Sequence, residues 1–327
     1  MHPPTLPILG NLTAGKTERH LVRLPGELLN DEARPVITVT GAQPGPVLFV
    51  NAGVHGGEYP AIEAVIRLGK LLDPARITGS VILMPVLNLP AFRTRTPFVC
   101  PIDNVNPNRV FPGDPNGSYS QQMTHALMTE FVAHADAYID LHGGDIPEAL
   151  VPFSICRGGS EEVDTKSREL AVAFGLPYVL AVNRPIQAAK GSSSYVAGAG
   201  RGVPSVLAEA GGVGQLQEDA VELLVAGVQR VMAHLRMLQA SLPPVSEPMI
   251  LSAFEWLYAR DAGMFYPRVA AGDLVEEGSV VGTVGSLFGD ELETLIAPVS
   301  GRVLFLTINP SVREEGLLMG IGAAPAE

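Results

Sequence analysis

The chain has 327 residues, of which 46% are hydrophobic and 17% are charged. This length and composition predict two domains, or one large domain with an appendage, and they exclude a disordered chain. The formal net charge of −12 argues against nucleic acid and against a membrane surface as partners, because both are anionic. The N-terminal segment lacks a basic and apolar leader, and no apolar run reaches the ~18 residues of a membrane helix. We therefore expect a soluble cytoplasmic protein, and the sequence leaves a homo-oligomer open.

The first three quarters of the chain alternate between predicted strands and helices. Apolar runs and helical spacing predict two strands within 35–54, a helix over 58–72, a strand that runs into a loop over 79–92, a helix over 120–135, a strand within 136–144 that ends in a histidine, a helix over 165–176, a strand over 177–182, a strand within 203–212 that ends in a glutamate, and a helix over 217–242. Such alternation predicts an α/β fold, in which a sheet is covered by helices on both faces and ligands bind at the carboxyl ends of the strands. The irregular segment 93–118 is long for a loop inside a compact domain, and loops of this length are usually functional.

The sequence pattern changes near residue 245. Residues 250–327 contain short runs rich in valine and glycine and show no helical pattern. We therefore expect a catalytic α/β domain over 1–245 and a compact all-β domain over 246–327.

Two histidines lie where predicted strands end, and each is followed by two glycines. His55 and Glu58 belong to "GVHGGEYPA", and His142 belongs to "DLHGG", with Asp140 two residues earlier. Two histidines and one glutamate are a common ligand set for catalytic zinc, and a nearby carboxylate often orients a ligating histidine. Each residue alone has a plainer interpretation, since a loop histidine is more often a solvated or core residue than a ligand, and the helix dipole favours a glutamate in the first turn of a helix. The shared context of the three favours a metal site.

Three further residues suit the chemistry of such a site. Asn108 and Arg109, within "NPNRVFPGD", could hold a carboxylate, since an arginine fork binds one in a bidentate manner. Glu209 ends the apolar run "SVLAEAGG", and beside a metal-activated water it would be a general base. The alternatives are a surface arginine and a glutamate that reaches water.

In its ordered motifs the sequence resembles the succinylglutamate desuccinylase/aspartoacylase family, a branch of the zinc carboxypeptidase fold. The motifs are "GVHGGEYPA", "NLPAF", "PIDNVNPNRVFPGD", "DLHGG", "LAEAGG" and "APVSGRV", and they span nearly the whole chain. The resemblance implies a mixed sheet flanked by helices, a C-terminal barrel-sandwich-like domain, and hydrolysis of the amide bond of a small N-acyl amino acid. It also implies one zinc ion per chain, with His55, Glu58 and His142 as its ligands.

The same resemblance places the carboxylate-binding pair on Asn108 and Arg109 and the catalytic glutamate on Glu209. The family usually has another arginine shortly before the Asn-Arg pair, which polarises the scissile carbonyl. This chain has no arginine at that spacing. Arg93 and Arg95 lie a little upstream, and of the two Arg95 is our candidate for the role.

The C-terminal module resembles the biotinyl/lipoyl type of domain. Residues 250–327 contain no lysine, which excludes the role of a carrier that is modified on lysine. Such a domain beside the active site would admit small substrates and exclude polypeptides. Two other functions stay open, a zinc carboxypeptidase acting on short peptides and a non-catalytic binding protein that retains the fold.

Overall fold

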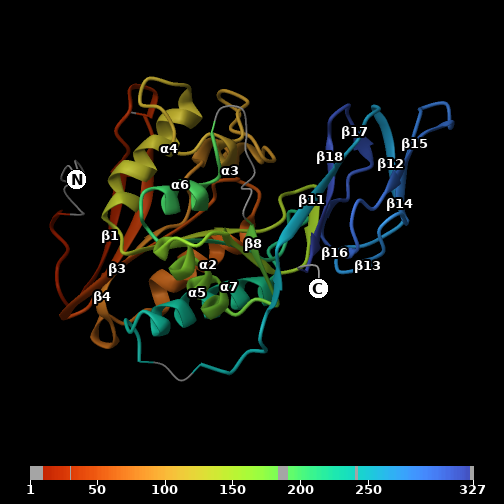
Figure 1. Cartoon of the computed structure of the whole chain (residues 1–327). Coiled ribbons are helices and arrows are strands. Elements are labelled where there is room, and N and C mark those ends of the chain that lie inside the picture. The colour runs from red at the N-terminus through yellow and green to blue at the C-terminus, as the bar shows by residue number, and fades with distance from the viewer. Residues whose placement is uncertain (1–9, 30, 183–190, 240–241, 325–327) are drawn as a thin grey trace.

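The computed structural model describes residues 10–29, 31–182, 191–239 and 242–324, which form a large α/β part followed by a smaller β part (Figure 1). A nine-stranded mixed sheet forms the centre of the α/β part. In spatial order its strands are β1 (Lys16–Arg23), β2 (Ala33–Thr40), β4 (Thr78–Met84), β3 (Gln43–Ala52), β5 (Ala137–His142), β9 (Ser205–Glu209), β7 (Phe153–Arg157), β8 (Tyr178–Val182) and β10 (Met249–Leu251).

The central strands explain where a site can form. Strand β3 pairs in parallel with β4 and β5, and β5 pairs in parallel with β9. All six residues of β5 are buried, as expected for a strand covered on both faces. Because β3, β5 and β9 run in the same direction, their carboxyl ends meet at one edge of the sheet.

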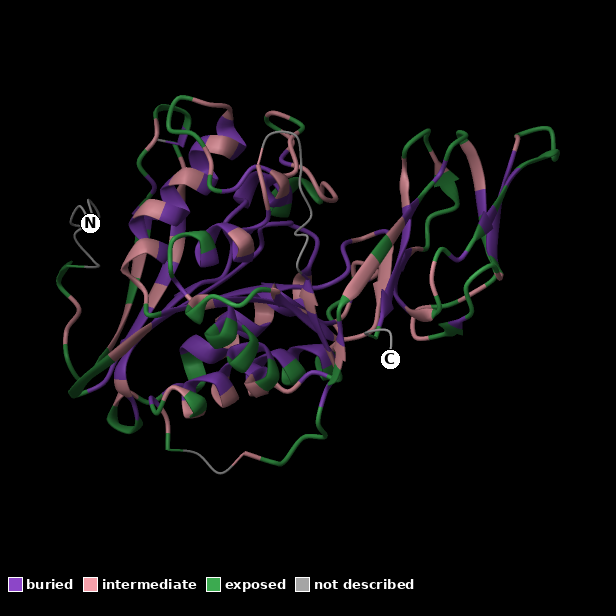
Figure 2. Cartoon of the chain, viewed as in Figure 1, coloured by how far each residue is buried: buried purple, intermediate pink, exposed green. Residues whose placement is uncertain are grey.

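Helices cover both faces of this sheet (Figure 1). One face carries α2 (Tyr59–Leu71), α5 (Glu162–Phe174) and α7 (Glu218–His234), and the other carries α3 (Leu89–Thr94), α4 (Tyr119–Glu130) and α6 (Ser194–Gly200). Short 3-10 turns complete the connections: η1 (Glu27–Leu29), η2 (Pro74–Arg76), η3 (Pro107–Arg109) and η4 (Val132–His134). In Figure 2 the helices are purple where they face the sheet and green where they face solvent.

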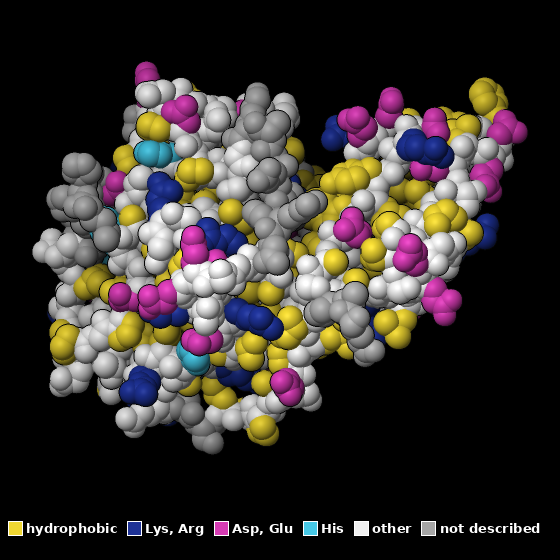
Figure 3. All heavy atoms as spheres, in the orientation of Figure 1, with side chains coloured by type: hydrophobic (Ala, Val, Ile, Leu, Met, Phe, Trp, Pro, Cys, Tyr) yellow, Lys and Arg dark blue, Asp and Glu magenta, His cyan; other side chains and the backbone are white. Residues whose placement is uncertain are grey.

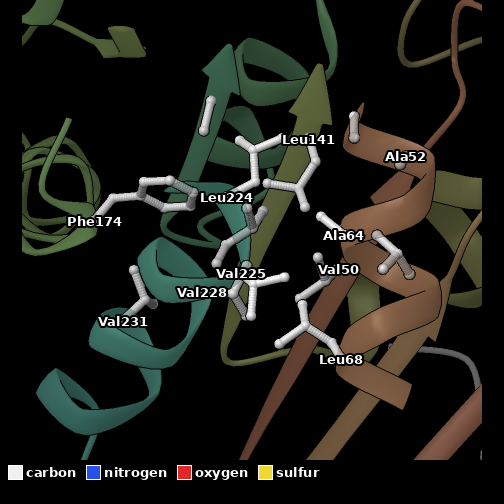
Figure 4. Close-up of a cluster of buried hydrophobic side chains, with 14 of the residues drawn as sticks. Val50, Ala52, Ala64, Leu68, Leu141, Phe174, Leu224, Val225, Val228 and Val231 are labelled. Atoms are coloured by element: carbon white, nitrogen blue, oxygen red, sulfur yellow. The ribbon is translucent and has the colours of Figure 1, made fainter. Parts of the chain in front are cut away.

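The main hydrophobic core lies between the sheet and the α2, α5 and α7 layer. Figure 4 shows Leu68 of α2, Leu224 and Val228 of α7, and Phe174 of α5 pointing toward Val50 of β3, and all of them belong to one buried cluster. Their helical spacing brings one apolar stripe of each helix onto the sheet, and this burial is the main force that holds the helices in place.

The last predicted helix, over 217–242, was too long. Helix α7 ends at His234, and the chain then turns back through Arg236, whose φ is 57°. The turn buries Met237, whose carbonyl accepts a hydrogen bond from the amide of Thr78 at 2.9 Å. A tertiary contact therefore ends a helix that sequence periodicity alone would continue. Strand β1 was not predicted because it is a largely polar edge strand without a clear apolar alternation.

The β part is a sandwich of two sheets around its own core. One sheet contains β11 (Ala253–Tyr258), β18 (Leu317–Ala323), β16 (Gly301–Thr307) and β13 (Leu274–Val275), and the other contains β15 (Glu291–Ile296), β14 (Val280–Gly285), β12 (Gly263–Pro267) and β17 (Ser311–Val312). The boundary predicted at residue 245 falls between α7 and β10. Strand β10 still belongs to the large sheet, and the sandwich starts at β11.

A short strand joins the two parts directly. Strand β6 (Glu148–Leu150), which follows β5, pairs antiparallel with β16, so that Glu148 lies opposite Thr307 and Leu150 opposite Phe305. The sandwich is thereby fixed beside the carboxyl ends of β5 and β9. Among the described residues, no helix is long and apolar enough to cross a membrane.

Candidate active site

The structure brings His55, Glu58 and His142 together at the carboxyl edge of the sheet. His55 follows β3, Glu58 immediately precedes α2, and His142 is the last residue of β5, the strand beside β3. One ligand atom from each residue lies within 4.8 Å of the others, and all three side chains are buried. A metal ion could therefore be held by three residues from two adjacent strand ends.

The two glycines between His55 and Glu58 are required by close packing. A Cβ at Gly56 would overlap the backbone at Phe92, and one at Gly57 would overlap the carboxylate of Asp145. Any other residue would push this loop away from α3 or from Asp145, and the two ligands would move with it. The glycines thus allow the histidine and the glutamate to face the same point.

Both histidines present the same nitrogen to Glu58. The Nδ1 atoms of His55 and His142 lie 2.7 Å and 2.9 Å from the two carboxylate oxygens of Glu58. Their Nε2 atoms lie 3.1 Å from Oδ1 of Asn106 and 3.0 Å from Oδ2 of Asp140, respectively. Because Asn106 and Asp140 accept hydrogen bonds from Nε2–H, the lone pairs of both Nδ1 atoms are left for a cation.

Glu58 is free to act as a ligand although it occupies the N-cap position of α2. Its side chain makes no capping hydrogen bond. Burial raises the pKa of Glu58, but the two neighbouring imidazoles outweigh burial and lower it to about 2. The carboxylate is therefore ionised, as a metal ligand must be.

Asp140 contacts the Nε2 side of the His142 ring, opposite the Nδ1 atom that faces Glu58. It is fully buried and accepts hydrogen bonds from Nδ2 of Asn51 at 2.9 Å and from the hydroxyl of Ser194. Burial acts to lower the pKa of His142, but the charges of Asp140 and Glu58 raise it well above its usual value. The cluster thus favours added positive charge, and a divalent cation would supply it.

Asn108 and Arg109 lie on η3 and line a cavity that His55 and Glu58 also line. Oδ1 of Asn108 accepts a hydrogen bond from the backbone amide of Ser194 at 3.0 Å, which leaves its Nδ2 donors for a ligand. Nη1 of Arg109 donates to the carbonyl of Asn108 at 2.8 Å, and no ion pair links this arginine to any described carboxylate. A partly buried guanidinium without a counter-ion is a suitable partner for a ligand carboxylate.

Glu209 ends β9 and lies opposite His142 in the β5–β9 register. Its Oε2 atom is buried and has no hydrogen-bond partner among the described residues. Burial raises the pKa of Glu209 well above its usual value, with a smaller opposing effect from His142. A carboxylate of raised pKa that is not engaged by the protein has the properties of a proton carrier.

His55, Glu58, Asn108, Arg109 and Glu209 line one cavity of about 530 Å³ at the junction of the two parts, and His142 adjoins it through its contact with Glu58. Figure 3 shows hydrophobic side chains gathered near this junction on the visible face. The cavity is lined by His55, Glu58, Pro97, Phe98, Val99, Asn106, Asn108, Arg109, Gly143, Glu148, Phe153, Ile155, Ser193, Tyr195, Leu207, Glu209, Phe254, Trp256, Phe305, Thr307, Arg313, Gly316 and Leu317.

Arg95 is not brought to this cavity. It caps the C-terminal end of α3 in a left-handed conformation, with φ of 56°, and its side chain is exposed. Arg93, the other upstream arginine, makes an ion pair with Glu32 at 2.6 Å. The short helix α3 turns both side chains to the surface.

Sequence reasoning did not single out several residues of the cavity. Asn106 orients His55, Glu148 places a further carboxyl group in the cavity, and Tyr195 and Trp256 complete its wall. Burial, with the charges of Glu58 and other acids, raises the pKa of Glu148 to about 8. The position of Glu148 soon after the second Gly-Gly pair was the one available signal, and Trp256 becomes part of the site only through the pairing of β6 with β16.

The fold and the site together define an α/β protein with a His-Glu-His cluster at its strand ends and a β-sandwich beside it. Residues 44–235 match the model of the succinylglutamate desuccinylase/aspartoacylase catalytic domain. The chain therefore belongs to the succinylglutamate desuccinylase/aspartoacylase family, and the predicted family and fold class are confirmed.

Known proteins agree with this assignment. The chain is 28% identical over 271 residues to an N-α-acetyl-L-2,4-diaminobutyric acid deacetylase of Halomonas elongata, which covers 81% of this chain and 77% of the relative. The fold of this chain is similar to that of the ectoine utilization protein EutE of Ruegeria pomeroyi in a product-bound structure, with a TM-score of 0.84, 21% identity and 98% of each chain covered. A succinylglutamate desuccinylase/aspartoacylase of Rhodobacter sphaeroides gives a TM-score of 0.83 at 23% identity, with 95% and 96% covered.

Proposed function

We propose that this protein is a zinc-dependent deacylase that hydrolyses the amide bond of small N-acyl amino acids. One observation carries the proposal: His55 and Glu58 of the His55–Glu58–His142 cluster line the same cavity as Arg109, which has no ion pair among the described residues, and Glu209, whose Oε2 has no partner among them. The name of the Halomonas elongata relative, a deacetylase of an N-acetylated amino acid, supports the same reaction class.

The donor set fits zinc. Two imidazole nitrogens and one carboxylate are a usual set for catalytic zinc, and here the Nδ1 atoms of His55 and His142 and the carboxylate of Glu58 would hold the ion. When bound, zinc polarises the acyl carbonyl and lowers the pKa of water toward ~7. Asp140 and Asn106 keep both imidazoles in the required tautomer.

The remaining residues bind the substrate and move the proton. Arg109 and the Nδ2 donors of Asn108 hold the substrate carboxylate, which sets the distance between that group and the scissile amide. Glu209 removes a proton from the attacking water and delivers it to the amide nitrogen, so that the amine leaves in neutral form. Arg95 is left out of this mechanism because its side chain lies on the surface, outside the cavity.

The β-sandwich bears on the alternative functions. A carboxypeptidase needs an open groove for the remainder of a peptide, whereas Trp256 and Phe305 of the sandwich line this cavity and limit its volume. A small substrate is therefore favoured over a peptide. A protein that binds without turnover would keep the ligands and Arg109, and only an assay separates it from an enzyme.

The test measures zinc and turnover on the same sample. We expect about one zinc per chain, release of free amino acid from N-acetyl amino acids, loss of activity on chelation, and recovery on adding zinc. Peptide cleavage without deacylation would favour the carboxypeptidase. Substrate binding without turnover in the zinc-loaded protein would favour the binding protein, and failure to take up zinc would refute the metal site.

A further inference from the structure

The C-terminal sandwich closes one side of the cavity with a wall of three aromatic side chains, which we call the aromatic wall. It consists of Phe254 and Trp256 on β11 and Phe305 on β16. The rings pack edge to face, with centroids 5.6 Å apart for Phe254 and Trp256 and 5.8 Å apart for Trp256 and Phe305. Phe254 and Trp256 remain partly exposed and line the cavity, so apolar surface is available to a ligand.

Arg109 lies directly against this wall. Its guanidinium carbon is 5.2 Å from the centre of the Trp256 ring, within the range of a cation–π contact. A carboxylate held by Arg109 therefore lies at the foot of the aromatic wall. In an N-acyl amino acid the side chain and the acylated nitrogen both branch from the carbon that carries the carboxylate. Because the scissile amide must face the proposed metal ligands, the side chain is the group left to face the wall.

The charges in the cavity do not suit a second carboxylate on the substrate. Apart from the proposed metal ligands and Glu209, the described residues that line the cavity include three with Arg or Glu side chains, the cations Arg109 and Arg313 and the carboxyl group of Glu148. Arg313 is exposed, so water screens its charge, and Arg109 is already assigned to the substrate's first carboxylate. An acidic side chain would therefore find no free buried cation among these residues with which to pair.

We infer that the substrates are N-acyl derivatives of amino acids with apolar side chains, and that the side chain packs against Phe254, Trp256 and Phe305. This inference rests on the proposed deacylase function and specifies its substrate class. The aromatic wall would exclude water from the side chain, and it would select by the apolar area that the substrate buries.

A substrate series tests the inference on the zinc-loaded wild-type protein. N-acetyl-leucine, N-acetyl-alanine and N-acetyl-aspartate share the acyl group and differ only in the side chain. We expect kcat/KM for the leucine compound to exceed that for the alanine compound by at least about 10-fold, since a few methylene groups in an apolar site give this much discrimination, and we expect aspartate to be poorest. Equal rates, or a preference for aspartate, would overturn the inference while leaving the deacylase function intact. Absence of any hydrolysis would instead refute the deacylase itself.

Variants assign the preference to the aromatic wall. Trp256→Ala should bring the ratio of kcat/KM for N-acetyl-leucine to kcat/KM for N-acetyl-alanine close to one. Trp256→Phe should keep part of the preference for leucine. If Trp256 served only to brace Arg109, its loss would slow both substrates equally and leave the ratio unchanged, which would contradict the proposal. Phe288→Ala is the matched control, because Phe288 belongs to the same sandwich but is 96% exposed and does not line the cavity. It should leave both rates and their ratio as in the wild type.

Discussion

Replacing Glu209 with glutamine separates proton transfer from binding. The substitution keeps the size of the side chain, and Oε2 has no partner among the described residues whose hydrogen bond would be lost. Glu209 is not a member of the cluster that could hold the metal, so the zinc content should not change. The substrate carboxylate is assigned to Arg109, so substrate binding should also survive.

The expected loss is in turnover. Positioned acid–base catalysis contributes roughly 100- to 10,000-fold in rate, which at 1.36 kcal/mol per tenfold is about 2.7 to 5.4 kcal/mol of the barrier. We expect kcat of Glu209→Gln to fall by this range in an assay of amine release. Because burial raises the pKa of Glu209, wild-type kcat/KM should decline as the pH falls through that raised value, where the base becomes protonated. This acid limb should be absent from the residual activity of the variant.

Two results would refute this reasoning. A variant with nearly wild-type kcat would show that Glu209 is not the proton carrier, and a variant that loses its zinc would show that Glu209 is a ligand. Glu255→Gln is the control, because Glu255 lies exposed on β11, and its substitution should change neither kcat nor metal content.

The remaining predictions concern the metal, the substrate carboxylate and pH. His142→Ala should hold far less than one zinc per chain by metal analysis while it still melts cooperatively, and full zinc occupancy would contradict its role as a ligand. Asp140→Asn should weaken zinc affinity about 10- to 100-fold in a chelator competition, because the hydrogen bond that orients His142 is altered, and unchanged affinity would contradict this. Arg109→Ala should weaken substrate binding by about 2–5 kcal/mol with normal zinc content, and an unchanged KM would show that Arg109 does not hold the substrate carboxylate. In the metal-free protein, Glu148 keeps a proton up to pH of about 8 that the unfolded chain releases near 4.5, so the free energy of unfolding should fall as pH rises between these values. Glu148→Gln should flatten that decline in thermal melts, and an identical slope would refute the assignment.

The sequence by itself determined the family, the α/β class and the candidate ligands. His55, Glu58 and His142 could be proposed as metal ligands because each lies near the end of an apolar run. The end of a buried strand is visible in the local sequence as a change from apolar residues to glycine. Parallel pairing of β3, β5 and β9 then places such strand ends at one edge. The chemistry of these positions is therefore readable from local pattern and a general rule of α/β sheets.

Only the tertiary structure decided which other side chains join the site. Arg95 is close in sequence to Asn108 and Arg109, yet α3 turns it to the surface, because the direction of a side chain depends on the helix that carries it. Trp256 is far from Arg109 in sequence, yet it lies 5.2 Å away because β6 adds to the sheet of the sandwich. Strand pairing between distant segments depends on the packing of whole sheets, and neither partner carries a local signal for it.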